Sequence, residues 1–296
     1  MESTVDMPVR EAFPKDLEVW RIRYGPDDDY MEVWKAPEPL LAKHGLQRWA
    51  VGFGSQQRET KELPPPDNYI FIGPNTQRSL VRIKQYLSWN GLSHAARGYN
   101  GRDFILRVMT AGGQGHNHLD IMRRLSRPPD ILRSQNHVLP MLDEIVFEDI
   151  VIGIFPRCSY NFTEAADMDE FASVEDLLYM VLQALEGITF LHGNSIAHRD
   201  LFLNNFMVEW CPASISHGRS ITRPRVYIID FETAVEFPET SSDSDRLCLE
   251  CPFERETYGR PMPPELESGD PYSPFLLDIW QFGSDLHKDH LVRFCC

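Results

Sequence analysis

A short polar motif constrains this 296-residue chain more than any other part of its sequence. His198-Arg199-Asp200-Leu201 is followed by Asn205, at the fifth position after the aspartate, and Asp230-Phe231 comes directly after an apolar run. Carboxylates and amides of this kind can orient a hydroxyl group and hold cations against a triphosphate, and phosphoryl transfer needs little else from a protein. The motif therefore points to chemistry at these residues.

The same residues resemble the catalytic centre of protein kinases. The first motif matches the H-R-D-L-x-x-x-N catalytic loop at every specified position, and Asp230-Phe231-Glu232 stands where those enzymes carry D-F-G. Pro263-Pro264-Glu265 takes the place of A-P-E, and residues 278–283 resemble the D-x-W-x-x-G helix, whose aspartate braces the catalytic loop. These downstream motifs favour the protein-kinase lineage.

The likeness runs from about residue 85 to residue 285. In the run 225–235 and the turn Gly259-Arg260-Pro261, the chain most resembles the divergent kinase-like proteins of mushroom-forming fungi. The resemblance implies an α+β, two-lobed fold with a small β-rich lobe and a mainly helical lobe. It also implies that the chain uses ATP and Mg²⁺ and acts on, or binds, another protein.

The resemblance also assigns roles to single residues. Asp200 would accept the proton of the substrate hydroxyl, as the catalytic base. Asn205 and Asp230 would coordinate Mg²⁺ and thereby hold the nucleotide. Arg199 would dock a phosphorylated activation segment, and Arg107, the best match to the lysine that binds the ATP phosphates, would contact the cofactor.

Four positions depart from the kinase pattern. Arg107 replaces the lysine by a larger, planar cation, and His118 stands at the position of its glutamate partner. Phe202 replaces a lysine that in serine/threonine kinases touches the transferred phosphate, and Glu232 replaces the conformationally free glycine of D-F-G. No G-x-G-x-x-G loop precedes these residues. Each loss of a transition-state contact would slow the reaction about a hundred- to a thousandfold.

Three functions therefore stay open. The first is phosphoryl transfer from ATP to protein serine or threonine. The second is a pseudokinase, a binding or scaffolding module with weak turnover or none. The third is a small-molecule kinase similar to choline kinase and aminoglycoside phosphotransferases, which carry a related loop and often an acidic residue after the metal-binding aspartate.

Three regions are expected along the chain. Residues 1–67 form an N-terminal extension, whose Trp20, Trp34 and Trp49 should pack on the main domain. Residues 68–157 form the smaller lobe. Residues 158–296 form the helical lobe, which we expect to be incomplete because a kinase lobe continues well beyond Gly283, leaving Trp280 and Phe282 exposed.

Local patterns predict several elements. Asn100-Gly101 before the apolar run 104–109 indicates a β-hairpin, and runs 138–142 and 150–155 indicate two further strands. Ser173 and Asp176 have the spacing of a capping box, which begins a long helix that ends near Gly193.

Composition excludes some alternatives. The net charge of −15, from 44 acidic and 29 basic residues, would repel a nucleic-acid backbone. No apolar run approaches the roughly 18 residues that span a bilayer. Because the first residues also lack a basic and apolar secretory signal, the expected location is the cytoplasm or the nucleus.

Overall fold

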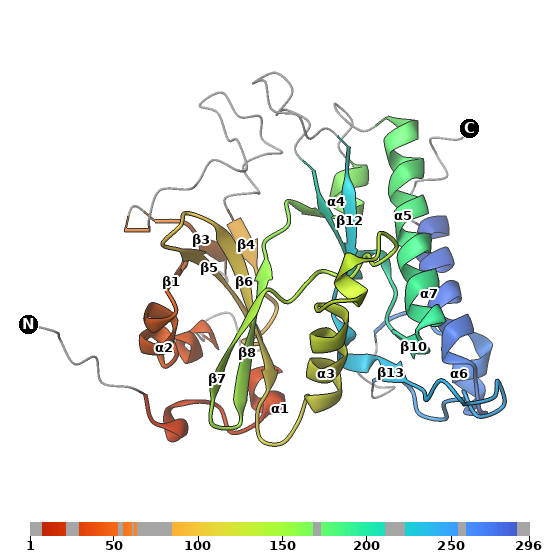
Figure 1. The fold of residues 1–296 in the computed structure, drawn as a ribbon, viewed down its shortest axis with the longest axis horizontal. Coiled ribbons are helices and arrows are strands. Elements are labelled where there is room, and N and C mark those ends of the chain that lie inside the picture. Colours follow the sequence, from red (N-terminus) through yellow and green to blue (C-terminus); the bar gives the residue numbers. More distant parts are fainter. Residues whose placement is uncertain are drawn as a thin grey trace, which may run out of the picture. The chain divides into compact units, whose positions relative to one another are not determined.

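The computed structural model describes residues 8–21, 30–52, 56–60, 62–63, 85–167, 173–210, 223–253 and 259–288. The chain divides into two compact units (Figure 1). Unit 1 comprises residues 1–119 and 140–157, and unit 2 comprises residues 120–139 and 158–296. Helix α3 (His116–Leu125) crosses the division between them.

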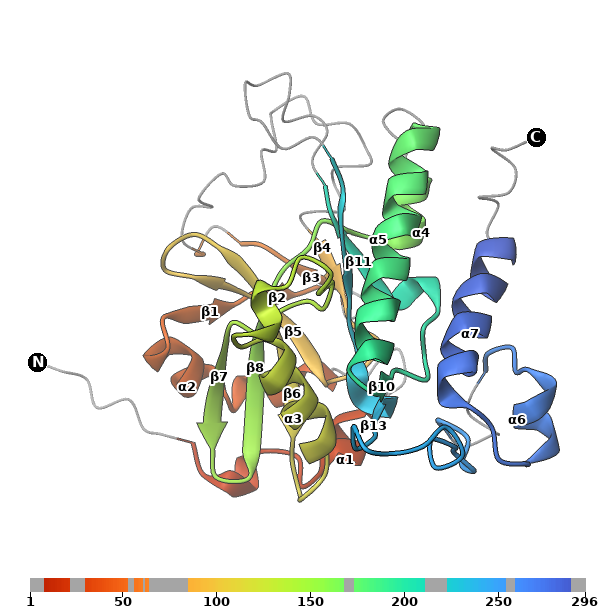
Figure 2. The ribbon, with the colours of Figure 1, turned by 45° about the vertical axis from the view of Figure 1, so that its right-hand side comes forward.

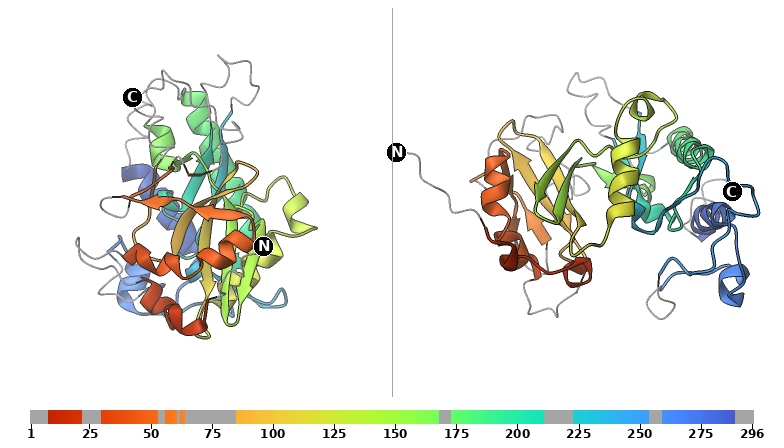
Figure 3. Two further views of the ribbon diagram at one scale, coloured as in Figure 1. Left: turned by 90° about the vertical axis from the view of Figure 1, so that its left-hand side faces the viewer. Right: turned by 60° about the horizontal axis from the view of Figure 1, so that its bottom comes forward.

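Unit 1 is built on a five-stranded antiparallel sheet with the strand order β1-β5-β6-β8-β7. Its strands are β1 (Leu46–Arg48), β5 (Ser93–Gly98), β6 (Asp103–Thr110), β7 (Asp143–Phe147) and β8 (Ile150–Pro156). Helices α1 (Leu17–Arg21) and α2 (Glu38–Lys43) lie on one face of this sheet (Figure 3). A second sheet joins β2 (Ala50–Val51), β3 (Gln56–Arg58) and β4 (Gln85–Leu87).

The alternation of side chains along the strands creates the core of unit 1. Leu106 and Val108 point to the same face of β6 and are almost fully buried. They belong to one hydrophobic cluster with Trp20 and Trp34, whose ring centroids lie 5.7 Å apart. Trp49 lies in a second cluster with Leu63 and Ala95. The expected packing of the three tryptophans is therefore found, whereas the boundary at residue 67 stays a prediction.

One hairpin was predicted correctly and one strand was not. Gly101 adopts a φ of 81° in the turn between β5 and β6, a conformation that suits glycine. The strand predicted at 138–142 is wrong, because Val138 forms only an isolated bridge with Ile228 and the strand begins at Asp143. Pro140 has no N–H group to donate to a β-ladder, which explains the late start.

Unit 2 is mainly helical (Figure 2). Its helices are α4 (Phe162–Ala166), α5 (Val174–Gly193), α6 (Pro264–Ser268) and α7 (Pro274–Lys288). One small sheet has the order β12-β11-β9, and β10 pairs with β13. These strands are β9 (Tyr160–Asn161), β10 (Ile196–Ala197), β11 (Phe206–Glu209), β12 (Arg225–Ile228) and β13 (Val235–Glu236). The predicted α+β class is confirmed.

The long helix begins where the sequence predicts. The Ser173 hydroxyl oxygen accepts a hydrogen bond from the Asp176 N–H, and the Asp176 carboxylate accepts one from the Ser173 N–H. This capping box satisfies donors that a helix N-terminus otherwise leaves unpaired. Met180, Ala184 and Ile188 then recur on one buried face of α5.

Of the two side chains expected to be exposed at the end of unit 2, Trp280 is half-buried and Phe282 is buried, so the expectation is wrong for Phe282. Phe282 is only 3% exposed and packs against Phe206, with ring centroids 5.2 Å apart. The exposed apolar side chains of α7 are Leu276 and Ile279. Within the described residues, no helix is long and apolar enough to span a membrane.

Short 3₁₀ helices complete the described elements. They are η1 (Arg10–Ala12), η2 (Tyr30–Lys35), η5 (Asp130–Leu132), η6 (Leu203–Asn205) and η8 (Phe231–Thr233).

Replacing Trp34 by alanine tests whether the N-terminal segment is an integral part of unit 1. Trp34 is completely buried and donates a hydrogen bond from Nε1 to the Gly91 carbonyl, so its truncation should lower the free energy of unfolding by about 3–5 kcal/mol. Urea denaturation measures this loss. Trp89, which is 67% exposed, provides the matched control as W89A, and equal effects of both variants would contradict the packing described.

Candidate active site

The predicted catalytic loop follows directly after β10. Pairing of Ile196 and Ala197 with Glu236 and Val235 places residues 198–200 beside the segment 231–234. The loop ends in η6, where the Asn205 carbonyl accepts a hydrogen bond from the Ile229 N–H. Asp200, Asn205 and Asp230 are thus brought together in unit 2, although thirty residues separate the first and the last.

Three polar side chains of α7 hold the backbone of this loop. Asp278 accepts hydrogen bonds from the His198 N–H (2.9 Å) and the Arg199 N–H (2.6 Å). Gln281 accepts one from the Leu201 N–H at 2.9 Å and donates one to the Arg199 carbonyl at 2.9 Å. Asp285 accepts one from the Leu203 N–H at 3.0 Å. The bracing role expected for Asp278 is found.

The spacing of these side chains explains how one helix contacts a loop of six residues. Asp278, Gln281 and Asp285 stand at positions i, i+3 and i+7 and therefore share one face of α7. Sequence reasoning identified Asp278 alone and missed the other two. The sequence does contain a signal for them, because a stripe of polar residues along an otherwise apolar helix indicates buried polar partners.

Arg199 has a strained backbone at the centre of this loop. Its φ of 68° lies in the left-handed region, which costs a residue other than glycine about 1–3 kcal/mol. The hydrogen bonds of its N–H to Asp278 and of its carbonyl to Gln281 hold it there. The helix thus fixes a conformation that the loop would not adopt alone.

The Arg199 guanidinium is buried against neutral acceptors. It donates to the Tyr272 hydroxyl, at 2.8 Å from Nη2, and to the Glu250 carbonyl. Tyr272 in turn donates to the same carbonyl at 2.9 Å. Arg199 therefore anchors the segment around Glu250 through a tyrosine and the backbone, where the resemblance to kinases implies a phosphate group as partner.

His198 connects the loop to the segment after β12. Its Nε2 donates to the Ile229 carbonyl at 2.8 Å, and its Nδ1 accepts from the Asp200 N–H at 3.3 Å, which assigns the tautomer with hydrogen on Nε2. The Phe231 ring stands edge-on to the imidazole at 4.8 Å, and the Thr233 hydroxyl donates to the His198 carbonyl. The expected structural role of His198 agrees with these contacts.

Asn205 orients Asp200. Its Nδ2 donates to both the carbonyl and the Oδ2 of Asp200, each at 2.7 Å. Because the amide nitrogen faces two oxygens, the amide oxygen must point the other way. The Oδ1 of Asp200 accepts no hydrogen bond from the described residues, although the atom is buried.

Asp230 also adopts a left-handed backbone, with φ 69° and ψ 65°. Aspartate tolerates this region better than most residues. The following Glu232 lies in η8 and does not have a positive φ, so the glutamate fits without the conformational freedom of glycine. The replacement of D-F-G by D-F-E therefore does not strain this site.

Burial raises the pKa of Asp200 from 3.8 to about 6. The positive charge of Arg260 and the hydrogen bond from Asn205 oppose this rise, whereas the negative charge of Asp230 adds to it. The last contribution means that the two carboxylates are close enough to repel one another. A cation between or beside them would therefore be bound favourably.

The fifth predicted residue, Arg107, lies in unit 1. It stands in the central strand β6, opposite Ser93 of β5 and Gly153 of β8. His118, the residue expected to face it, is 6% exposed at the beginning of α3. The role of Arg107 in binding ATP stays a prediction.

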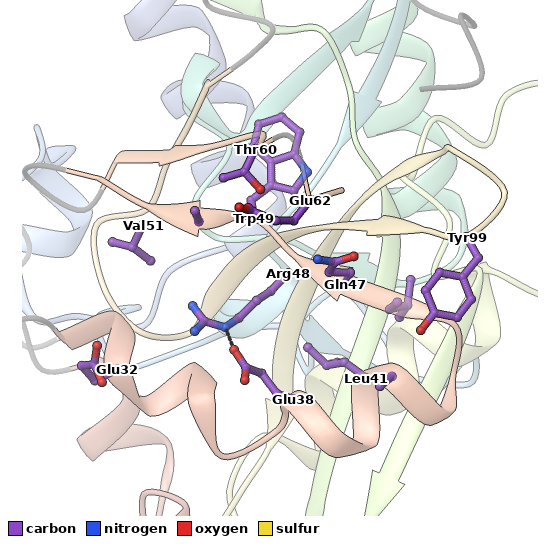
Figure 4. A pocket seen from close by; sticks show the side chains of 13 residues that line it. Glu32, Glu38, Leu41, Gln47, Arg48, Trp49, Val51, Thr60, Glu62 and Tyr99 are labelled. Atoms are coloured by element: carbon purple, nitrogen blue, oxygen red, sulfur yellow. Dashed lines mark hydrogen bonds and ion pairs between the residues drawn. The ribbon is translucent and has the colours of Figure 1, made fainter. Parts of the chain in front are cut away.

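A pocket of about 510 Å³ in unit 1 does not suit a triphosphate (Figure 4). Glu32, Glu38 and Glu62 line it, and its Arg48 is paired with Glu38. The lining therefore carries a net negative charge, which opposes the binding of phosphate groups.

Known proteins show partial similarity to this chain. A stretch of 121 residues, 40% of the chain, is 30% identical to the serine/threonine-protein kinase ppk8 of Schizosaccharomyces pombe and covers 18% of that protein. A stretch of 84 residues, 28% of the chain, is 31% identical to the serine/threonine-protein kinase CAK1 of Saccharomyces cerevisiae and covers 20% of it. The matches thus span about a fifth of each relative's length.

No family model matches the chain. The two partial similarities support a relationship to serine/threonine protein kinases. The closer resemblance to kinase-like proteins of mushroom-forming fungi stays a prediction.

Exchanging Asp278 for asparagine should destabilise unit 2. The amide would turn an NH₂ group toward one of two buried N–H donors, and an unsatisfied buried donor costs about 1–3 kcal/mol. Urea denaturation should show a loss of this size. The exposed Asp270 supplies the matched control, D270N, and a D278N variant as stable as D270N would argue against the bracing role.

Exchanging Asp200 for asparagine should stabilise the protein, and the gain should depend on pH. A carboxyl group whose pKa rises on folding stabilises the fold only while protonated, so its contribution is lost as the pH rises from 3.8 through about 6. The gain in free energy of unfolding should be about 2–3 kcal/mol at pH 8 and roughly half of that at pH 5.

The measurement is urea denaturation of both proteins in EDTA at the two pH values. A gain of the same size at pH 5 and pH 8 would mean that Asp200 does not titrate in this range.

Proposed function

We propose that this chain is a protein-kinase-like domain that binds ATP with Mg²⁺ and transfers the γ-phosphoryl group to a serine or threonine hydroxyl of a protein. The observation that carries the proposal is the pair formed by Asp200 and Asn205. The amide holds one carboxylate oxygen at 2.7 Å and leaves the other without a hydrogen bond from the described residues. A fixed carboxylate with one oxygen that lacks a hydrogen bond is suited to accept a proton from a hydroxyl.

The environment of Asp200 supports the role of a base. With a pKa of about 6, the carboxylate is ionised at neutral pH yet more basic than an ordinary aspartate. Proton acceptance is most effective when the pKa of the base lies near the working pH. Asp200 would take the proton of the hydroxyl while Asn205 keeps the carboxylate in place.

The oxygens of Asn205 and Asp230 fit Mg²⁺. The Asn205 amide oxygen points away from Asp200, and magnesium prefers oxygen ligands in an octahedral shell that it shares with water and phosphate. No three histidine, cysteine, aspartate or glutamate side chains gather into a metal site among the described residues. The protein would therefore supply one amide and one carboxylate, as is usual for magnesium bound with nucleotide. Bound Mg²⁺ would neutralise charge on the phosphates.

The acceptor class rests on the partial similarities. Both relatives are serine/threonine-protein kinases by name, which favours a protein hydroxyl as the acceptor. A small-molecule acceptor of the choline or aminoglycoside type is the less favoured possibility.

A pseudokinase is the second candidate, and the residues that depart from the kinase pattern favour it. Arg107 is a planar fork where a lysine would supply a compact ammonium group, so phosphate contacts made by lysine are not reproduced by it. A domain with weak turnover or none would keep the braced loop for binding alone.

Titration with Mg-ATP separates these functions. At about 100 times its dissociation constant, a bound nucleotide should stabilise the protein by ~2.7 kcal/mol and raise Tm by several degrees. Radiolabel from [γ-³²P]ATP should then appear in a generic protein substrate, and D200N should abolish transfer while D270N does not.

Each outcome separates the candidates. A protein that shows no change in Tm at millimolar Mg-ATP does not bind the nucleotide. This result would contradict both the protein kinase and the small-molecule kinase. A rise in Tm without transfer identifies the pseudokinase. Labelling of choline or an aminoglycoside, but never of protein, would establish the small-molecule kinase instead.

A further inference from the structure

Arg260 approaches the candidate base from a distant part of the chain. Its Nε lies 3.4 Å from the Oδ1 of Asp200, and its Nη1 donates to the Oδ1 of Asn204 at 3.0 Å. The guanidinium also stacks over the Phe202 ring, 4.6 Å from the centroid. All four residues belong to unit 2. The aromatic ring and Asn204 thus fix a cation beside the oxygen of Asp200 that lacks a hydrogen bond.

These contacts leave part of the guanidinium available. A separation of 3.4 Å is longer than a normal N–H···O hydrogen bond, and Nη2 makes no hydrogen bond with the described residues. The Arg260 side chain is 30% exposed, so a ligand can reach it. A guanidinium presents donors in a planar fork that matches two oxygens of a phosphoryl group.

The charges around the site give this cation a function. Asp200 and Asp230 are both acidic, and a transferring phosphoryl group brings further negative charge. The other nearby guanidinium, that of Arg199, is buried and engaged by Tyr272 and the Glu250 carbonyl. Among the described arginines and lysines, only Arg260 comes within 4 Å of an Asp200 carboxylate oxygen.

We propose that Arg260 binds the phosphoryl group during its transfer and replaces the cation that the sequence lacks at Phe202. This role rests on the proposed kinase function. The substrate hydroxyl oxygen attacks the γ-phosphorus and its proton passes to Asp200, while the bond from phosphorus to the β,γ-bridging oxygen breaks and ADP leaves with that electron pair. Arg260 donates hydrogen bonds to the non-bridging oxygens as their charge spreads.

The position of the hydroxyl explains why Arg260 can reach the phosphoryl group. A hydroxyl that hydrogen-bonds to the Oδ1 of Asp200 lies about 2.7 Å from it, next to a guanidinium that is 3.4 Å from the same oxygen. When the hydroxyl lies on the same side of Oδ1 as Arg260, the phosphorus it attacks comes within reach of the guanidinium. Phe202, which looks like a loss in the sequence, becomes the surface on which this cation rests.

Steady-state kinetics of R260A, R260K and a matched control test the proposal. Arg223 also stacks on an aromatic ring, that of Tyr179, and pairs with a carboxylate, that of Glu175, but it is exposed and outside the site. We expect R260A to lower kcat about a hundred- to a thousandfold with little change in KM for ATP, and R260K to recover part of the loss. R223A should keep the wild-type kcat.

Binding of a phosphoryl mimic gives a second measurement that does not need turnover. Mg-ADP with fluoroaluminate should raise the Tm of the wild type above its value with Mg-ADP alone. R260A should respond to Mg-ADP like the wild type but lose the additional rise. Urea denaturation of R260A and R223A verifies that both fold.

Several results would overturn the proposal. If R260A is as active as the wild type and keeps the response to fluoroaluminate, Arg260 does not bind the phosphoryl group. If R260A is more active, the guanidinium blocks the base. If the wild type responds to no nucleotide and transfers no phosphate, the proposed function itself fails, and this role falls with it.

Discussion

The candidate site depends on one buried carboxylate, that of Asp278. Its side chain is completely buried, and a buried charge without partners would cost several kcal/mol. The carboxylate accepts hydrogen bonds from the backbone of His198 and Arg199 and is paired with the His192 ring at 2.9 Å. Because two of these donors belong to the predicted catalytic loop, the loop cannot move away without leaving the charge unpaired. The helix and the loop therefore stabilise each other.

This constraint extends to two of the predicted site residues. Arg199 and Asp230 both adopt left-handed backbones, which isolated loops would avoid. Arg199 is held by α7. Asp230 is positioned by the preceding residue, Ile229, whose N–H donates to the Asn205 carbonyl and whose carbonyl accepts a hydrogen bond from the His198 ring. The braced loop thus places the two acidic side chains near each other. Their repulsion then makes the site favourable for cations.

The sequence predicted those parts of the structure that depend on neighbouring residues. The capping box at Ser173 and the turn at Gly101 each follow from short spacings with a clear physical reason. The bracing aspartate Asp278 was instead implied by the resemblance to the D-x-W-x-x-G helix of kinases. The prediction of a strand at 138–142 was wrong because a hydrophobic run suggests a strand even where a proline prevents pairing. The exposure of Phe282 was wrong because burial depends on Phe206, which is far away in the sequence.

Contacts between residues that are far apart in the sequence also decide what the candidate site contains. Two departures from the kinase pattern, Phe202 and Glu232, appear in the sequence as losses of a cation and of a hinge. In the structure, Glu232 lies in an ordinary 3₁₀ turn, and the Phe202 ring stacks against the guanidinium of Arg260. Electrostatic stabilisation depends on where a charge lies relative to the reacting atoms, not on its position in a motif. A motif therefore shows which charge is missing from its usual position, whereas only the folded chain shows whether another residue supplies it.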